Sequence, residues 1–167
     1  MEIREAVPND AMRVADVHVR AWQVAYRGLV PEEYLAGLRA EDWAKRYTFG
    51  LMDPGAPQTL LALDGERLRG FATVGTGRDE DLAGQGEVFA LYVDPPHWGK
   101  GAGVMLMGAA RARLCEQGYA GAFLWVLKGN ERARRFYELD GWRSDGCKRI
   151  DISRGIEIVE FRMRRQL

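Results

Sequence analysis

The sequence contains few of the residues on which thiol, metal or serine chemistry depends. Its only cysteines, Cys115 and Cys147, are too few for a disulfide framework, and neither lies in a CxxC or Cys/His spacing that would hold a metal ion. The two histidines are far apart and no HExxH motif occurs, so no metal site is predicted. The only serines, Ser144 and Ser153, lie outside any GxSxG turn, which disfavours a serine hydrolase.

An excess of either charge is also missing. The chain has 24 Lys and Arg residues against 24 Asp and Glu residues, so no overall field attracts nucleic acid or an anionic membrane. No apolar run approaches the ~18 residues that a membrane helix needs. The N-terminus is charged where a signal peptide would turn apolar. We therefore expect a cytoplasmic protein with neither a nucleic-acid nor a membrane partner.

What the chain does contain is enough apolar residues for one core. Of its 167 residues 47% are hydrophobic and 29% are charged, which excludes a disordered or low-complexity chain. This length is typical of one domain. No internal repeat or linker interrupts it, so residues 1–167 are predicted to form a single domain.

The period of the apolar residues changes along the chain and indicates where helices and strands lie. Alternation over residues 1–7 predicts a strand, and helical spacing follows with Asn9 or Asp10 at the capping position. The other predicted elements are helices ending at 28, beginning at 31 and over 41–51, strands over 59–63, 68–74 and 87–93, a helix over 103–118, a strand over 122–127, a helix over 130–141, and strands over 142–152 and 155–163. The strand over 87–93 is apolar throughout, which predicts that both its faces are covered. This order predicts an α/β fold in which one sheet of mixed direction has helices on both faces.

A glycine-rich turn joins the strand over 87–93 to the next helix. Gly99, Gly101 and Gly103 alternate along it, and the backbone N–H groups from about Gly99 to Val104 would converge on one point. The first turn of a helix has unpaired N–H donors and a positive dipole end, so this arrangement suits a phosphate, with Lys100 adding charge at the rim. The alternative is a loop that only turns a strand into a helix.

Two familiar phosphate loops do not fit these residues. A nucleotide P-loop needs glycine at position 94 and serine or threonine after the Gly-Lys pair, but the chain has Asp94 and Gly101 there. A dinucleotide fingerprint that starts at Gly99 needs glycine or alanine in place of Val104. The residues therefore fit neither loop, and a turn without any ligand stays open.

Three segments in this order resemble the GCN5-related N-acetyltransferase (GNAT) superfamily. They are Leu91-Tyr92-Val93-Asp94-Pro95, Gly99-Lys100-Gly101-Ala102-Gly103, and residues 130–138 (NERARRFYE) followed by Gly141-Trp142. One departure is Trp98, which stands where the family's phosphate loop has Gln or Arg. The resemblance implies a single N-acetyltransferase domain over residues 1–167, with a largely antiparallel sheet of about six to seven strands.

The resemblance also implies that acetyl-CoA is the acetyl donor. Its diphosphate would bind the N–H groups of the glycine loop, and its pantetheine arm would lie along the strand that ends at Val93. Asn130 would contact the same arm, besides capping its helix. The implied cofactor contacts are Leu91, Tyr92, Val93, Gly99, Lys100, Gly101, Ala102, Gly103, Val104, Asn130, Ala133 and Tyr137.

Attack of a neutral amine on a thioester requires a base, an oxyanion donor and an acid for the departing thiolate. Tyr137 matches the family's Phe-Tyr position and is predicted to be the acid, although an aromatic residue packed under the sheet has the same spacing. The backbone N–H of Val93 is the predicted oxyanion donor. Glu87 is the candidate base, acting through water, and its alternative is a solvated strand end.

The acceptor is expected to bind beside the first helices. Trp22 and Tyr26 lie four residues apart on one helix face, and with Tyr92 they are the predicted acceptor contacts, unless they are core packing. The acids of the segment 78–81 are a further candidate for attracting an amine. Trp125 replaces the Glu found in enzymes that acetylate ribosomal-protein N-termini, which argues against that branch.

A peptide amine or a small-molecule amine therefore both stay open as acceptor. The terminal strands would also allow a homodimer to form by edge pairing. The competing hypothesis for the whole chain is a catalytically silent acyl-CoA-binding sensor or interaction module on the same fold.

Overall fold

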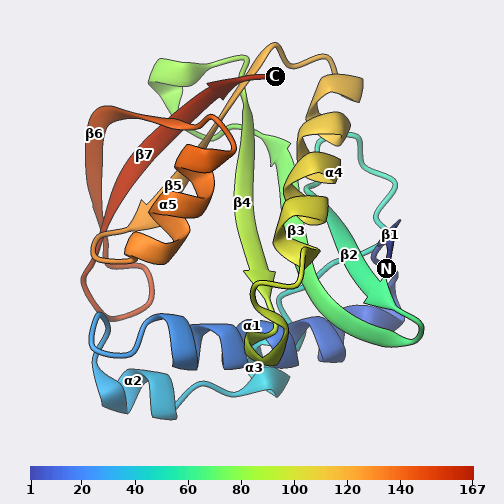
Figure 1. Cartoon of the computed structure of the whole chain (residues 1–167), viewed down its shortest axis with the longest axis vertical. Helices are drawn as coiled ribbons and strands as arrows, with labels where there is room; N and C mark the ends of the chain where they lie inside the picture. The colour runs from blue at the N-terminus through green and yellow to red at the C-terminus, as the bar shows by residue number, and fades with distance from the viewer.

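The computed structural model describes residues 1–167 and contains a single seven-stranded sheet (Figure 1). The strands are β1 (Glu2–Glu5), β2 (Gln58–Asp64), β3 (Arg67–Thr76), β4 (Gly86–Val93), β5 (Gly121–Leu127), β6 (Arg143–Asp151) and β7 (Ile158–Gln166). Their order across the sheet is β1-β2-β3-β4-β5-β7-β6. Only β4 and β5 pair in parallel, which confirms the predicted mixed and largely antiparallel sheet.

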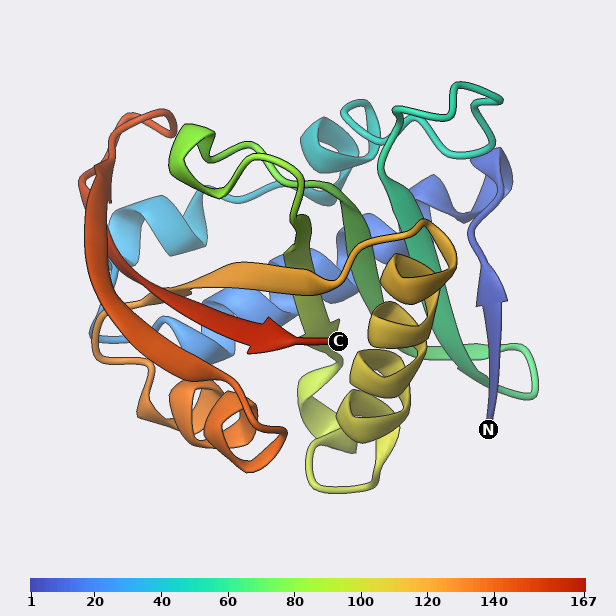
Figure 2. The same ribbon diagram turned by 90° about the horizontal axis from the view of Figure 1, so that it is seen from above.

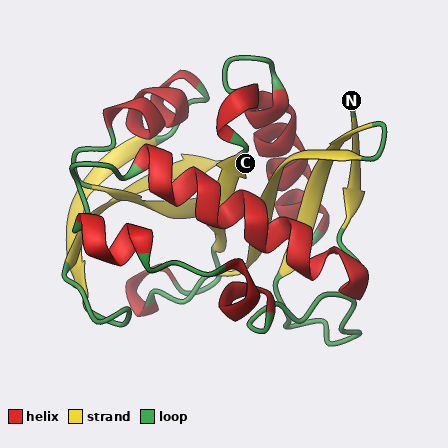
Figure 3. Ribbon diagram, turned by 90° about the horizontal axis from the view of Figure 1, so that it is seen from below, coloured by secondary structure: helices red, strands yellow, loops and turns green.

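Helices cover both faces of the sheet, as predicted. They are α1 (Ala11–Ala25), α2 (Glu32–Ala36), α3 (Ala40–Ala44), α4 (Ala102–Glu116) and α5 (Glu131–Leu139). Figure 2 shows α4 and α5 on one side of the sheet, and Figure 3, from below, shows α1 crossing the other side with α2 and α3 beside it. None of these helices has both the length and the apolar character needed to span a membrane.

The core has two layers because neighbouring residues of a strand point to opposite faces. Leu61 of β2 is fully buried in a cluster with Val14 and Val17 of α1. Its neighbour Ala62 belongs to the larger cluster on the other face, together with Leu106 of α4. The sheet is thus held between α1 and α4, which fixes the direction of β4 between them.

The helix predicted over 41–51 is too long, since α3 ends at Ala44. The rings of Tyr47 and Phe49 stack 5.0 Å apart, and Tyr47 also meets Phe71 of β3 edge-on at 6.3 Å. Side chains two residues apart lie on opposite sides of a helix, so both can reach this surface only when the backbone leaves the helix. Burial of these rings therefore overrides the local helical pattern.

Asp10 lies at the predicted capping position but does not cap α1. Its carboxylate accepts the Val7 N–H at 2.8 Å and forms ion pairs with Arg4, at 2.7 Å, and with Arg13. The hydrogen bond from Arg4 is the main reason that the pKa of Asp10 lies well below its ordinary value. The residue therefore ties β1 to the start of α1.

Strands β4 and β5 separate after a short parallel contact, and Figure 1 shows them diverging. Their paired residues are Gly86–Ala122, Glu87–Phe123 and Val88–Leu124. On the other side of β4 the register with β3 shifts so that Phe89 has no partner, which is the signature of a β-bulge. The predicted cover on both faces is therefore wrong beyond Val88, because Phe89 to Val93 are only half-buried.

Candidate active-site cleft

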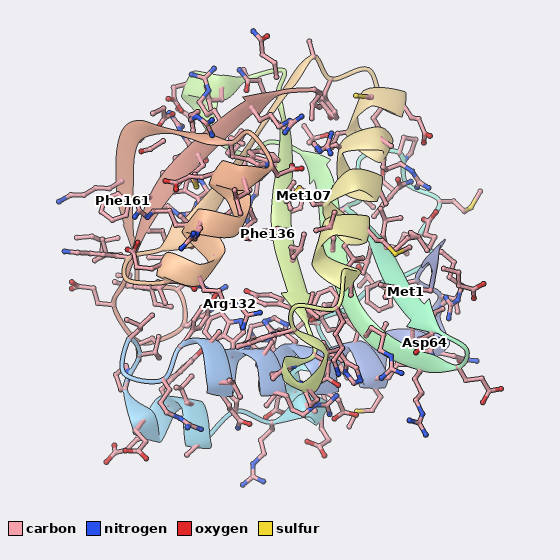
Figure 4. All side chains as sticks on the ribbon, viewed as in Figure 1. Met1, Asp64, Met107, Arg132, Phe136 and Phe161 are labelled. Carbon is pink, nitrogen blue, oxygen red and sulfur yellow. The ribbon has the colours of Figure 1, made fainter.

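The divergence of β4 from β5 opens a cleft of about 590 Å³. Nineteen of its 25 lining residues are hydrophobic, and they come from α1, β4, β5, the glycine loop and α5. Figure 4 labels Arg132 and Phe136 on α5, the helix that borders one side of the cleft. A Cβ atom at Gly103 would lie 3.5 Å from the Phe136 ring, so α4 and α5 approach closely there.

The glycine loop forms one end of this cleft. Gly99 and Gly101 have φ angles of 73° and 89°, in the left-handed region that glycine tolerates best. None of the backbone N–H groups from Gly99 to Val104 donates a hydrogen bond within the protein. Gly101 is the N-cap of α4, so these free donors surround the positive end of a 15-residue helix. An arrangement of this kind is suited to binding an anion.

Only some of the predicted cofactor contacts in this loop line the cleft. Gly99, Gly101, Gly103 and Val104 line the cleft. Lys100 does not line it, and its Nζ instead donates to the Pro96 carbonyl oxygen at 3.0 Å. Ala102 is buried in the core cluster of α4, so only its backbone is available to a ligand.

Trp98 and Arg132 close one side of the loop. The indole N–H of Trp98 donates to the carbonyl oxygen of Val93 at 2.7 Å, which fixes the ring between β4 and the loop. The Arg132 guanidinium stacks over that ring, 3.6 Å from its centre. Burial lowers the pKa of Arg132, with no carboxylate contributing an opposite effect. No local sequence pattern marks Arg132 as part of the site, because its stacking partner, Trp98, is 34 positions earlier in the chain.

Strand β4 and helix α5 bring most of the other predicted cofactor contacts into the same cleft. Its walls include Leu91, Tyr92, Val93, Asn130, Ala133 and Tyr137. Asn130 caps α5, since its side-chain oxygen accepts the Ala133 N–H at 3.2 Å. Tyr137 is 9% exposed, and burial, followed by the charge of Tyr92, raises the pKa of its hydroxyl well above the ordinary value.

A second cavity, of about 170 Å³, adjoins the cleft. Tyr26 and Tyr92 line both, and their hydroxyl oxygens lie 3.5 Å apart. Burial raises the pKa of both hydroxyls. Trp22 lines only the second cavity, with its ring 4.7 Å from that of Tyr26. These three residues thus pack in or against a core cluster and also line a cavity. Core packing, which the sequence left open for them, therefore does not exclude a contact with the acceptor.

Glu87 lies in the second cavity and is not a solvated strand end, because it is only 1% exposed. Its Oε1 accepts Arg78 Nη2 at 2.8 Å, and its Oε2 accepts both Nε and the backbone N–H of Arg78 at 3.1 Å. The carboxylate is therefore held in one orientation at the point where β4 leaves β5.

The acids of the segment 78–81 were candidates for attracting the acceptor amine, but two of them are paired with an arginine. Asp79 and Asp81 form ion pairs with Arg162 at 2.8 and 2.6 Å, and Asp145 adds a third at 2.7 Å. Arg162 is 5% exposed, and the hydrogen bond that it donates to Asp81 is the first of the causes that raise its pKa. These aspartates neutralise a buried arginine, so they are not free to attract an amine.

The remaining walls of the second cavity come from β6, β7 and the turn between them. They carry Arg149, Asp151, Ser153, Arg154 and Glu160. The sequence shows only a strand-like alternation in this region, so nothing in it singled out these residues as part of a site.

Comparison with known proteins matches this architecture to one family. The sequence model described as "Acetyltransferase (GNAT) family" matches residues 18–142. An uncharacterised N-acetyltransferase of Archaeoglobus fulgidus is 36% identical over 140 residues, which are 82% of this chain and 89% of the relative.

Solved structures share the fold. The PaiA N-acetyltransferase of Thermoplasma acidophilum, in complex with coenzyme A, superposes with a TM-score of 0.78 at 22% identity and covers 99% of this chain and 98% of its own. YncA of Salmonella typhimurium, solved with its cofactor acetyl-CoA, has a TM-score of 0.72 at 17% identity, covering 100% and 94%. The family match spans most of the chain, and the chain belongs to the acetyltransferase (GNAT) family.

Proposed function

We propose that this chain transfers the acetyl group of acetyl-CoA to a primary amine of a small molecule or peptide, by direct attack of the amine on the thioester. Acetyl-CoA is the co-substrate in keeping with the family and with neighbours that bind CoA or acetyl-CoA. The observation that carries the proposal is the run of free N–H groups from Gly99 to Val104 at the end of an apolar cleft. These donors suit the diphosphate, and the cleft suits the pantetheine arm.

The free edge of β4 supports this placement. The Asp94 N–H donates to the Arg69 carbonyl oxygen, so it points toward β3. Successive N–H groups of a strand point to opposite sides, which directs the Val93 N–H toward the cleft. An amide arm can pair with this edge as an added strand would, and the Val93 N–H can stabilise an oxygen on which negative charge develops.

Arg132 replaces the charge that the loop lacks at Trp98. Arg132→Ala should weaken acetyl-CoA binding about 10-fold at low salt, because one charge-assisted contact to a phosphate is lost. The difference should shrink as salt screens the contact. Calorimetric titration measures both effects, with Arg135→Ala as the matched control on the same helix. Equal affinities of the Arg132→Ala and Arg135→Ala variants would remove Arg132 from the binding site.

The thioester supplies an electrophilic carbonyl carbon and a thiolate leaving group. The amine nitrogen forms the new C–N bond, the C–S bond breaks, the nitrogen loses a proton and the sulfur gains one. A buried Tyr137 holds its proton more firmly than a free phenol, whereas a thiol has a pKa near ~8.5. The hydroxyl of Tyr137 therefore acts by donating a hydrogen bond to the departing sulfur. The amine proton leaves through water to the base, and the thiolate takes its own proton from water.

Glu87 is the proposed base, and its hydrogen bonds with Arg78 determine the route by which it can accept a proton. Both of its oxygens already accept hydrogen bonds, so it takes a proton most readily through a water molecule that reaches the second cavity. Glu87→Gln should lower kcat/KM by about 10²-fold and shift the acidic limb of the pH–rate profile. Glu80→Gln, at an exposed acid in the segment between β3 and β4, is the control. An unmoved acidic limb would assign the base to another group.

The overall assay mixes the protein with acetyl-CoA and a panel of amines and follows the release of free thiol. Release that depends on both the amine and the protein supports the transferase. Acetyl-CoA binding with no release across the whole panel would favour the silent acyl-CoA-binding module instead. Absence of any acetyl-CoA binding at millimolar concentration would reject both.

A further inference from the structure

The second cavity has the size and position of an acceptor pocket for a small molecule. It meets the cleft at Tyr26, Val88 and Tyr92, so a group bound there faces the cleft at the point where β4 and β5 diverge. At about 170 Å³ the cavity is smaller than the roughly 300–1,000 Å³ pockets that hold drug-sized ligands, so it suits a compound about as small as an amino acid. An oligosaccharide or a folded peptide segment is too large for it.

Several N–H donors in the cavity walls have no hydrogen-bond acceptor within the protein. The Arg149 guanidinium donates one hydrogen bond within the protein, from Nε to Oε1 of Glu160 at 3.0 Å, and its two Nη atoms have no acceptor. Arg154 uses one Nη atom, which donates to Asp151 at 2.7 Å, and its buried Nε has no partner. The buried indole N–H of Trp22, a residue that is 3% exposed, also has no acceptor in the protein.

Two of the three carboxylates around the same cavity accept hydrogen bonds on both oxygens, and the third, Glu160, accepts one from Arg149 on Oε1. Glu87 accepts three hydrogen bonds from Arg78. Asp151 accepts the Ser153 N–H on one oxygen and Arg154 on the other. The walls therefore offer more N–H donors than acceptors, although three arginines and three acids balance in formal charge. A ligand that fills this cavity should bring acceptor oxygens, and an arginine fork matches a carboxylate best.

These walls also disfavour the polycationic amines among the open acceptors. A second ammonium group would lie beside Arg149 and Arg154, and the one carboxylate there with an oxygen free of hydrogen bonds, Glu160, already pairs with Arg149. In a cavity this small, like charges repel strongly because little water screens them.

We propose that the acceptor is a small amino acid, or a compound of that chemistry, whose carboxylate binds Arg154 and Arg149 while its amine faces the thioester. This inference rests on the proposed transferase function and specifies its substrate class. Arg154, in the turn between β6 and β7, lies over the Trp22 ring at 5.1 Å, so the carboxylate end is set at the α1 side of the cavity. The amine then points toward Tyr92 and the cleft.

The test compares each of the common amino acids, β-alanine and γ-aminobutyrate with its own carboxamide and with the amine that lacks the carboxyl group. Rates are compared per neutral amine, because removal of the carboxylate changes the amine pKa. We expect at least one free acid to exceed its carboxamide by about 10- to 100-fold in kcat/KM, the value of a charge-assisted hydrogen bond. Carboxamides or polyamines that react equally well or better would overturn the inference.

Variants separate this inference from the transferase assignment. Arg154→Gln should abolish the preference for the acid, mainly through KM, and Arg154→Lys should restore part of it. Arg164→Gln, exposed on β7, should leave the preference unchanged. If other amines of the broader panel react with acetyl-CoA but none of these amino acids does, the transferase function stands and the acceptor class is wrong. If acetyl-CoA does not bind the unmodified protein, the transferase function itself fails.

Discussion

Replacement of Gly101 by valine should weaken acetyl-CoA binding by about 10²- to 10³-fold. Gly101 has a φ angle of 89°, where a side chain costs about 1–2 kcal/mol, and a β-branched residue is among the least tolerant. If the backbone relaxes to relieve this strain, the N–H groups no longer converge, and each lost bond to a phosphate oxygen costs about 1.5–3 kcal/mol. The loss of about two such bonds gives the expected loss of affinity.

Gly108 provides the matched control, because it is a second glycine in the first half of the adjoining helix. Its φ is not positive, and a Cβ there meets nothing within 4 Å. Gly108→Ala should therefore stabilise α4 by about 0.5–1 kcal/mol and leave acetyl-CoA affinity unchanged. Calorimetry and thermal unfolding of both variants measure the two effects separately. Near-native affinity of the Gly101→Val variant would mean that the loop amides do not bind the diphosphate.

The sequence was most informative where local chemistry determines local structure. The glycines from Gly99 to Gly103 permit left-handed backbone between a strand and a helix, and Asn130 carries a capping side chain at the next strand–helix corner. The periods of the apolar residues and the order of the predicted elements likewise predicted the sheet and its mixed direction. These features depend on residues close together in the chain, so one sequence is enough to find them.

Features that depend on contacts between residues far apart in the chain could not be predicted from the sequence. The bulge at Phe89 and the separation of β4 from β5 change a strand expected to be covered into a cleft wall. Arg132 gains its position from Trp98, and Arg154 from the fold of the terminal hairpin. The run of acids after Arg78 was also misleading, because Asp79 and Asp81 accept hydrogen bonds from Arg162, more than 80 positions away, and are not free for an amine. In each case tertiary packing decides the role of the side chain.

Tyr137→Phe should lower kcat by about 10²-fold while the acetyl-CoA dissociation constant stays within about twofold of the parent value. The substitution keeps the ring that packs in the core cluster and removes only the oxygen, so the melting temperature should hardly change. Because burial raises the hydroxyl pKa, the group stays protonated up to and beyond pH 10. Its own titration therefore causes no loss of activity as pH rises from 6 to 10, and the variant should keep the shape of the parent pH–rate profile at a lower level.

Tyr119→Phe is the matched control for this prediction. Tyr119 also carries a hydroxyl, which hydrogen-bonds the Thr76 hydroxyl at 2.7 Å, but it does not line the cleft. Steady-state kinetics should find its kcat unchanged, so that a loss seen only for Tyr137→Phe reports the cleft hydroxyl. Burst measurements separate chemistry from product release, which matters because only the step that breaks the C–S bond should slow. Full turnover by the Tyr137→Phe variant would show that the departing sulfur takes its stabilisation from another donor, and the free N–H groups along β4 would be the next groups to test.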